Sequence, residues 1–204
     1  DEDEDEDGDD GLNEVGGAPG APGVAPAAFH RFMRRRSRAW PHSLNATATH
    51  DTKRGEDTRA RLNVLSERPA RWERRLYHWA RLNRGHKSYP QGREAPDRND
   101  EHLLYQTLVG TWPWSGRPDD AYRQRIREYV IKSVREAKLH TGWLQPDQDY
   151  EGAYLEFVER VLDPGASGEF LEDLAAFAAE IAHYGALNSL SQTAVKLAAP
   201  GVPD

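Results

Sequence analysis

The residues best suited to chemistry lie close together, where His50 and Asp51 are followed by Lys53 and Arg54. From Ser43 to Thr49, small apolar residues alternate with polar ones, which predicts a short strand that ends just before the His-Asp pair. Acidic residues at 56 and 57 suit the positive end of a helix dipole and predict that a helix begins there. A His-Asp pair between a strand and a helix occupies the position where β/α barrels carry their chemistry.

These residues also have ordinary structural interpretations. Glu56 and Asp57 can be helix-start charges, and Asp57 is spaced from Arg61 as an i,i+4 ion pair. Lys53 and Arg54 can pair with the same carboxylates on the surface, where such pairs are common and contribute little. They can equally donate hydrogen bonds to a ligand at the end of the strand. The residue types alone leave both interpretations open.

The stretch from Asn45 to Arg61 resembles the fourth sequence region of the α-amylase superfamily. Its continuation, Thr-Lys-Arg-x-Glu-Asp-x-Arg, resembles one family within it, the maltooligosyl trehalose synthases. Other stretches resemble that family in the family's own order, and together they cover nearly everything from Gly11 onward. They are Leu12–Gly17, Trp40–His42, Tyr105–Leu108 with Trp112-Pro113, Arg135–Thr141, Ser189–Gln192 and Ala199–Asp204.

The resemblance implies an activity and a role for each residue of the motif. Members of the family break the terminal α-1,4 bond of a maltooligosaccharide and re-form it as an α,α-1,1 bond through a covalent intermediate, without metal or other cofactor. Asp51 matches the carboxylate that stabilises the transition state. His50, Lys53 and Arg54 would bind the substrate. The nucleophile and the acid/base belong to earlier strands in this superfamily, so we expect them to be absent from this chain.

The resemblance also implies a mostly α fold, in which a helical elaboration joins strand 7 and the start of strand 8 of an incomplete (β/α)8 barrel. We expect a barrel segment at 12–54 with strand 7 and the His-Asp motif, a helical insertion at 55–198, and a lead-in to strand 8 at 199–204. An acidic tail at 1–11, expected to be disordered, does not resemble the family. On this interpretation the chain is an internal slice of an enzyme.

Hydrophobic periodicity and punctuation predict the helices independently of the resemblance. Pro26 can open a helix, Ala186 to Leu197 forms the last one, and the stretch from Tyr89 to Asp97 interrupts the series. The remaining predicted helices are Pro69–Asn83, Asp100–Val109, Asp119–Leu139, Asp147–Leu162 and Gly168–Tyr184. The spacing of Trp72 and Trp79 predicts core packing. Trp112 and Trp114 lie in a predicted turn, where a sugar could stack, although packing is the favoured interpretation.

Composition narrows the remaining classes of function. The net charge is −7, but residues 1–10 hold nine acidic residues, so the rest of the chain has 34 − 9 = 25 acidic against 27 basic residues, a balance of +2. Nucleic-acid binding is therefore not favoured, and the arginine-rich stretches are interpreted as solvated helix faces. His78 and His86 lack a third metal ligand nearby. The absence of cysteine and of a long apolar span predicts a soluble, cytoplasmic protein that does not bind membranes.

Two alternatives remain beside the glucosylmutase interpretation. The chain could be a non-catalytic helical interaction module, or a fragment of another glycoside hydrolase or transglycosylase of the α-amylase superfamily. The sequence does not predict an oligomeric state, a glucan length preference or an origin for the acidic run.

Overall fold

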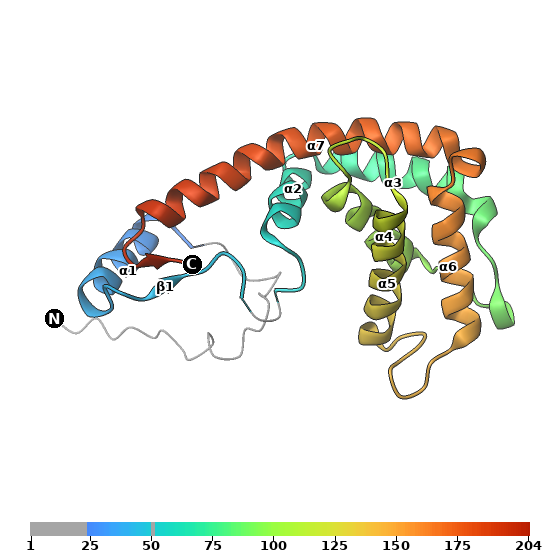
Figure 1. Cartoon of the computed structure of the whole chain (residues 1–204), viewed down its shortest axis with the longest axis horizontal. Helices are drawn as coiled ribbons and strands as arrows, with labels where there is room; N and C mark the ends of the chain where they lie inside the picture. The colour runs from blue at the N-terminus through green and yellow to red at the C-terminus, as the bar shows by residue number, and fades with distance from the viewer. Residues whose placement is uncertain (1–23, 50–51) are drawn as a thin grey trace. The chain divides into compact units, whose positions relative to one another are not determined.

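The computed structural model describes residues 24–49 and 52–204, and its secondary structure is mostly helical (Figure 1). In chain order the elements are α1 (Pro26–Ala39), β1 (Leu44–Asn45), α2 (Glu56–Ser66), α3 (Pro69–Asn83), the 3-10 turns η2 (Arg84–His86) and η3 (Pro90–Gly92), α4 (Arg98–Thr111), α5 (Asp120–Ala137), α6 (Gln148–Leu162), α7 (Pro164–Ala198) and β2 (Val202–Pro203). Among the described residues, no helix is both long and apolar enough to cross a membrane. The chain divides into a terminal unit, residues up to Glu56 with Leu187–Asp204, and a helical unit, Asp57–Ala186.

Aspartate caps set the starts of three helices in the helical unit. The side chains of Asp97, Asp119 and Asp147 each accept a hydrogen bond from the backbone N–H three residues later, at 2.7–3.0 Å. Such caps satisfy one of the amides that the first turn of a helix leaves without a partner. This is why the predicted starts of α4, α5 and α6 differ from the observed ones by no more than two residues.

The core of the helical unit is built around an aromatic cluster. Trp79 of α3 is fully buried, and its ring lies 5.6–5.9 Å from the rings of Trp72, Tyr105, Phe170 and Phe177. Aromatic rings at such separations contribute beyond the apolar area that they bury. The predicted core packing of Trp79 is confirmed, and Trp72 packs against the core while remaining partly exposed.

The last helix is longer than the sequence pattern predicts. The two helices expected at 168–184 and 186–197 form one continuous helix, α7, with non-helical backbone only at Ser167 near its start. The predicted break at Gly185 is wrong because this glycine lies inside the helix, where a Cβ would meet the Arg61 side chain at 2.6 Å and its Cα at 2.8 Å. The glycine is there for a close helix approach, which the sequence pattern alone does not distinguish from a helix end.

The terminal unit contains one parallel strand pair. Leu44 is in register with Val202 and Asn45 with Pro203, and the Val202 amide donates to the Ser43 carbonyl at 2.9 Å. Gly201, at φ +125°, allows this approach because a Cβ there would lie 2.5 Å from the Ser43 oxygen. The strand predicted from 43 to 49 is therefore confirmed only at two residues, since β2 offers a pairing partner for just those two.

Candidate functional site

The predicted site segment lies between β1 and α2. Two of the residues predicted for the site, His50 and Asp51, lie outside the described residues, so their side chains are not placed. On either side of them, the Thr49 amide donates to Thr52 Oγ1 at 2.8 Å, and that hydroxyl donates to the Thr49 carbonyl at 2.7 Å. The two threonines thus fix the backbone at both borders of the His-Asp pair.

Lys53 has an uncommon backbone conformation. Its φ is +65°, and the Arg54 amide donates to the Thr52 carbonyl at 2.7 Å, which closes a three-residue turn around it. A non-glycine residue in the left-handed region costs about 1 kcal/mol or more, and such residues occur often at functional sites. The Lys53 side chain is exposed and Arg54 is half-buried. The two basic side chains that adjoin in sequence therefore differ in exposure.

The acidic residues at the start of α2 have partners of their own. The Glu56 carboxylate accepts a hydrogen bond from the Thr47 hydroxyl, which joins the two ends of the segment. Asp57 interacts electrostatically with Arg61, as the i,i+4 spacing predicts: burial lowers the pKa of the Arg61 guanidinium, and Asp57 opposes that shift. Both contacts agree with the prediction that these two carboxylates are structural.

A second group of ionisable side chains lies in the helical unit, where the sequence analysis did not predict it. Oxygen and nitrogen atoms of Asp97, Asp100 and His140 lie within 4.8 Å of one another, and His140 stacks on Tyr150 with centroids 4.5 Å apart. His140 Nε2 lies 2.8 Å from Asp97 Oδ2, and the Tyr150 hydroxyl donates to Asp100. These groups therefore meet one another's hydrogen-bonding needs, and the bond between Asp97 and His140 joins residues 43 positions apart. The arrangement connects the start of α4 to the loop before α6.

Burial and hydrogen bonds act in opposite directions on the two carboxyls of this group. Burial alone would raise the pKa of Asp97, but the Asp100 amide and His140 bond to its carboxylate and lower that pKa. Burial raises the pKa of Asp100, against the hydrogen bond from Tyr150. One carboxylate thus keeps its charge beside the histidine while its neighbour takes a proton more readily. The only sequence signal for this group is that Asp100 stands at a predicted helix start, and nothing in the sequence connects either carboxyl to His140.

Glu151 is the centre of an adjoining buried network. Arg135 Nε and Nη2 donate to its two oxygens at 2.8 and 2.6 Å, and the Thr141 hydroxyl donates at 2.6 Å. The hydrogen bonds from Arg135 are the largest cause of the lowered pKa of Glu151. Such a bidentate, charge-assisted pair connects α5 to α6 and stabilises their packing.

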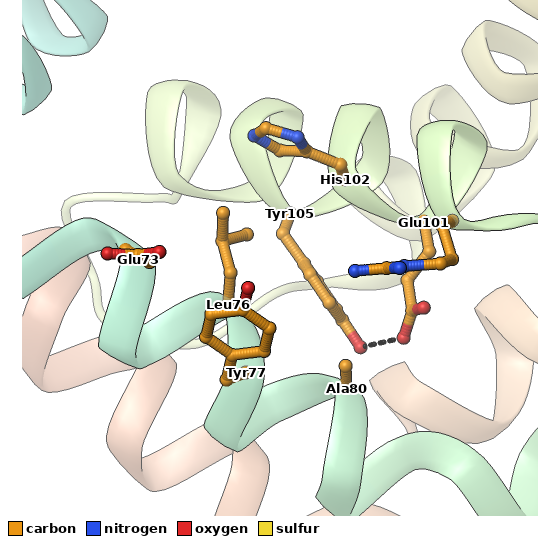
Figure 2. A pocket seen from close by; sticks show the side chains of 8 residues that line it. Glu73, Leu76, Tyr77, Ala80, Glu101, His102 and Tyr105 are labelled. Carbon is orange, nitrogen blue, oxygen red and sulfur yellow. Dashed lines mark hydrogen bonds between the residues drawn. The ribbon is translucent and has the colours of Figure 1, made fainter. Parts of the chain in front are cut away.

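Figure 2 shows a pocket of about 280 Å³ between α3 and α4. The Tyr105 hydroxyl donates to Glu101 at 2.7 Å, and Lys87 Nζ lies 2.8 Å from the same carboxylate. The Glu101 carboxylate that lines the pocket therefore already has partners within the protein. Tyr77 is 63% exposed beside it. Burial lowers the pKa of the His102 imidazole, which favours its neutral form. Neither Lys53 nor Arg54 lines this pocket.

The remaining aromatic and arginine candidates are mainly structural. Of the two tryptophans in the predicted turn, Trp112 is buried and Trp114 is 71% exposed, with the Arg61 guanidinium 4.8 Å from its ring. Arg71 pairs with Glu180 at 2.6 Å, and its guanidinium lies 5.6 Å from the Phe177 ring. This contact confirms that Arg71 extends over apolar neighbours, and it adds an ion pair to α7 that the sequence did not predict.

Comparison with known proteins identifies the relatives of the chain. It is 37% identical over 193 residues, 95% of its length, to a Mycobacterium tuberculosis protein provisionally named a maltooligosyl trehalose synthase. Among solved structures, the maltooligosyltrehalose synthase of Arthrobacter ramosus is 36% identical over 93% of this chain, with a TM-score of 0.73. A hypothetical maltooligosyl trehalose synthase of Sulfolobus tokodaii is 32% identical over 89% of it, with a TM-score of 0.76.

The match is nearly complete for this chain and partial for its relatives. The chain spans 23% of the M. tuberculosis protein, 22% of the A. ramosus chain and 23% of the S. tokodaii chain. No family model matches it. Almost the whole chain is thus homologous to one segment of the maltooligosyl trehalose synthases, and the resemblance expected from its motifs is confirmed.

Proposed function

We propose that this chain, a homologue of one segment of the maltooligosyl trehalose synthases, forms part of an intramolecular α-glucosyl transferase. The enzyme would convert the α-1,4 bond at the reducing end of a maltooligosaccharide into an α,α-1,1 bond. The observation that carries the proposal is the 37% identity over 95% of the chain, which includes both the motif segment and the helical unit. A helical interaction module would not require the motif segment to be part of that match.

We assign β1 to strand 7 and β2 to the start of strand 8 of a (β/α)8 barrel. Their parallel register supports the assignment, since neighbouring barrel strands run parallel and are joined by helical crossovers. Residues 12–54 would then belong to the barrel, 55–198 would be the helical insertion and 199–204 would lead into strand 8. The outer edges of this two-residue pair would bond to other strands of the barrel.

Asp51 would act on the transition state. The hydrogen bonds between a carboxylate and the 2- and 3-hydroxyls of a glucose ring strengthen as the ring flattens and positive charge develops at its anomeric carbon. His50 would donate to hydroxyls of the same sugar. The nucleophile that forms the covalent intermediate and the acid/base that protonates the leaving oxygen would come from the part of the enzyme outside this chain.

Lys53 and Arg54 would hold the released glucose while it turns to present its anomeric hydroxyl. The support for this role is the left-handed turn at Lys53 and the exposure of the Lys53 side chain. Holding the sugar suppresses attack by water and favours transfer over hydrolysis.

A chimera tests the proposal. Residues 24–204 of this chain replace the homologous segment of the A. ramosus enzyme, and the product mixture from maltopentaose is assayed for non-reducing ends and for free glucose. We expect the chimera to form non-reducing product. Asp51→Asn should lower kcat about a thousandfold, equivalent to about 4 kcal/mol, with KM changed far less. Lys53→Ala should raise the ratio of hydrolysis to transfer.

Asp57→Asn is the matched control, because it makes the same chemical change six residues later at a helix start. It should leave kcat within about threefold, since Asp57 is exposed and a helical i,i+4 pair contributes less than about 1 kcal/mol. A folded chimera in which Asp51→Asn keeps near-normal kcat would remove Asp51 from the catalytic role. A folded chimera with hydrolysis but no transfer would point instead to another activity of the superfamily.

A further inference from the structure

Helix α1 carries a concentrated basic face. It has five arginines in fourteen residues and no acidic residue. Arg31, Arg34, Arg35 and Arg38 are spaced i, i+3, i+4 and i+7, so at 100° per residue they fall on one side of the helix. All four are exposed. We call this set the arginine face.

The fifth arginine of α1, Arg36, differs from these four because its guanidinium forms hydrogen bonds within the chain. Arg36 lies on the opposite side of the helix and donates to Ser43 Oγ at 2.7 Å and to the Leu44 carbonyl at 3.0 Å. Among the other four, the Arg35 guanidinium lies 5.9 Å from the Phe32 ring. No carboxylate of residues 24–49 and 52–204 forms an ion pair with the arginine face. Four adjacent like charges on one helix repel each other, at a cost that a bound anionic group would remove.

The same chain contains the complementary charge. Residues 1–10 hold nine acidic residues, and residues 11–25 connect them to the start of α1. Fifteen residues can span up to about 50 Å, whereas the arginine face extends over only about 10 Å of helix. A tethered ligand at such short range has an effective concentration on the order of millimolar. The balance of +2 outside the acidic run argues against an intermolecular polyanion as the main occupant.

We propose that the arginine face of α1 is the docking surface for the chain's own acidic segment, residues 1–10. Docking would neutralise the positive charge concentrated on this helix, and it does not depend on the proposed glucosyl transfer. The contact is electrostatic between many exposed groups, so it should depend strongly on salt and little on the order of acidic residues.

A spin label tests the contact in the intact chain. Because the sequence has no cysteine, Gly8→Cys provides a single attachment point within the acidic segment. In about 20 mM salt, where screening is weak, the amide signals of residues 31–38 should lose more than half their intensity relative to the reduced label. About 0.5 M NaCl should restore them. Chains without the spin label are mixed with spin-labelled chains, so that contact between two molecules is distinguished from contact within one.

Two charge variants provide the comparison. Replacing all four residues of the arginine face by glutamine should abolish the broadening. The control makes the same change at four exposed arginines of the helical unit and should leave the broadening intact: Arg74, Arg81, Arg84 and Arg117. Broadening that survives loss of the arginine face, that is absent from residues 31–38, or that appears only between molecules would overturn the proposal.

Binding to heparin gives an independent measure. Neutralising the acidic segment, with Asn for Asp and Gln for Glu, should raise heparin affinity at least tenfold in the native background and in the control background. In the variant whose arginine face is replaced by glutamine, the same neutralisation should raise heparin affinity less than threefold. An equal gain in all three backgrounds would mean that the segment acts through net charge alone, which would also contradict docking.

Discussion

Gly185 allows α7 to approach α2 more closely than any other residue would permit. Replacing it by alanine would place a methyl carbon 2.6 Å from Arg61 Cγ and 2.8 Å from Arg61 Cα. The nearer atom could move with its flexible side chain, but the second belongs to the backbone of α2. The two helices must therefore separate by more than half an ångström to reach ordinary contact distance.

The cost of this separation outweighs the gain in helix propensity. Alanine inside a helix is favoured over glycine by about 1 kcal/mol. Overpacking costs about 1–3 kcal/mol, and the hydrogen bond from Arg61 to the Trp112 carbonyl, 2.8 Å long, contributes about 1 kcal/mol that would be weakened. We expect Gly185→Ala to lower the free energy of unfolding by about 1–3 kcal/mol.

Gly152 provides the matched control, because it lies inside α6 and a Cβ added there would have nothing within 4 Å. Gly152→Ala should raise the free energy of unfolding by about 0.5–1 kcal/mol. Urea unfolding of the intact chain, followed by circular dichroism, measures both variants. For the 130-residue helical unit, a change of 1 kcal/mol in the free energy of unfolding corresponds to a shift of roughly 4 °C in Tm. A Gly185→Ala variant as stable as Gly152→Ala would refute the close-packing argument.

Three further outcomes are expected. Glu151→Gln should cost about 2–3 kcal/mol at pH 7. Because Arg135 lowers the folded pKa of Glu151, this stabilisation is present above the unfolded pKa and is lost as pH falls through the folded pKa, so urea unfolding at pH 3 should show a smaller difference. Trp79→Phe should cost about 2 kcal/mol, because it removes the 2.7 Å hydrogen bond to Asp173, and thermal unfolding would measure it. The chain alone should form no non-reducing product and release no glucose from maltopentaose; turnover lost in Asp51→Asn would contradict the expectation that the nucleophile and acid/base lie elsewhere.

Local signals predicted the helices of the helical unit well. Aspartate caps and prolines at first helical positions act within three or four residues, so α3 was predicted at its observed bounds and α4 to α6 to within two residues at their starts. The break predicted at Gly185 was wrong because the same residue type serves a helix end and a helix crossing. Only the position of Arg61, more than a hundred residues away, distinguishes the two.

A motif of sequence neighbours can be recognised from the sequence, whereas a group of side chains that only the fold brings together cannot. The motif from His50 to Arg54 was recognisable because its residues are consecutive. Asp97 and His140 are 43 positions apart, and no periodicity connects a helix cap to a loop histidine. The strand expected over 43–49 was shortened for a similar reason, since pairing depends on what β2 presents across the register.

The strand pair that joins the two ends of the chain also orders the events of folding. The hydrogen bond from Asn45 to the Pro200 carbonyl spans 155 positions. Closing so long a loop in an unfolded chain costs about 4–5 kcal/mol, more than the roughly 1 kcal/mol that each of its few hydrogen bonds returns. We therefore expect the pair to form after the helices between its strands have folded and shortened the effective loop.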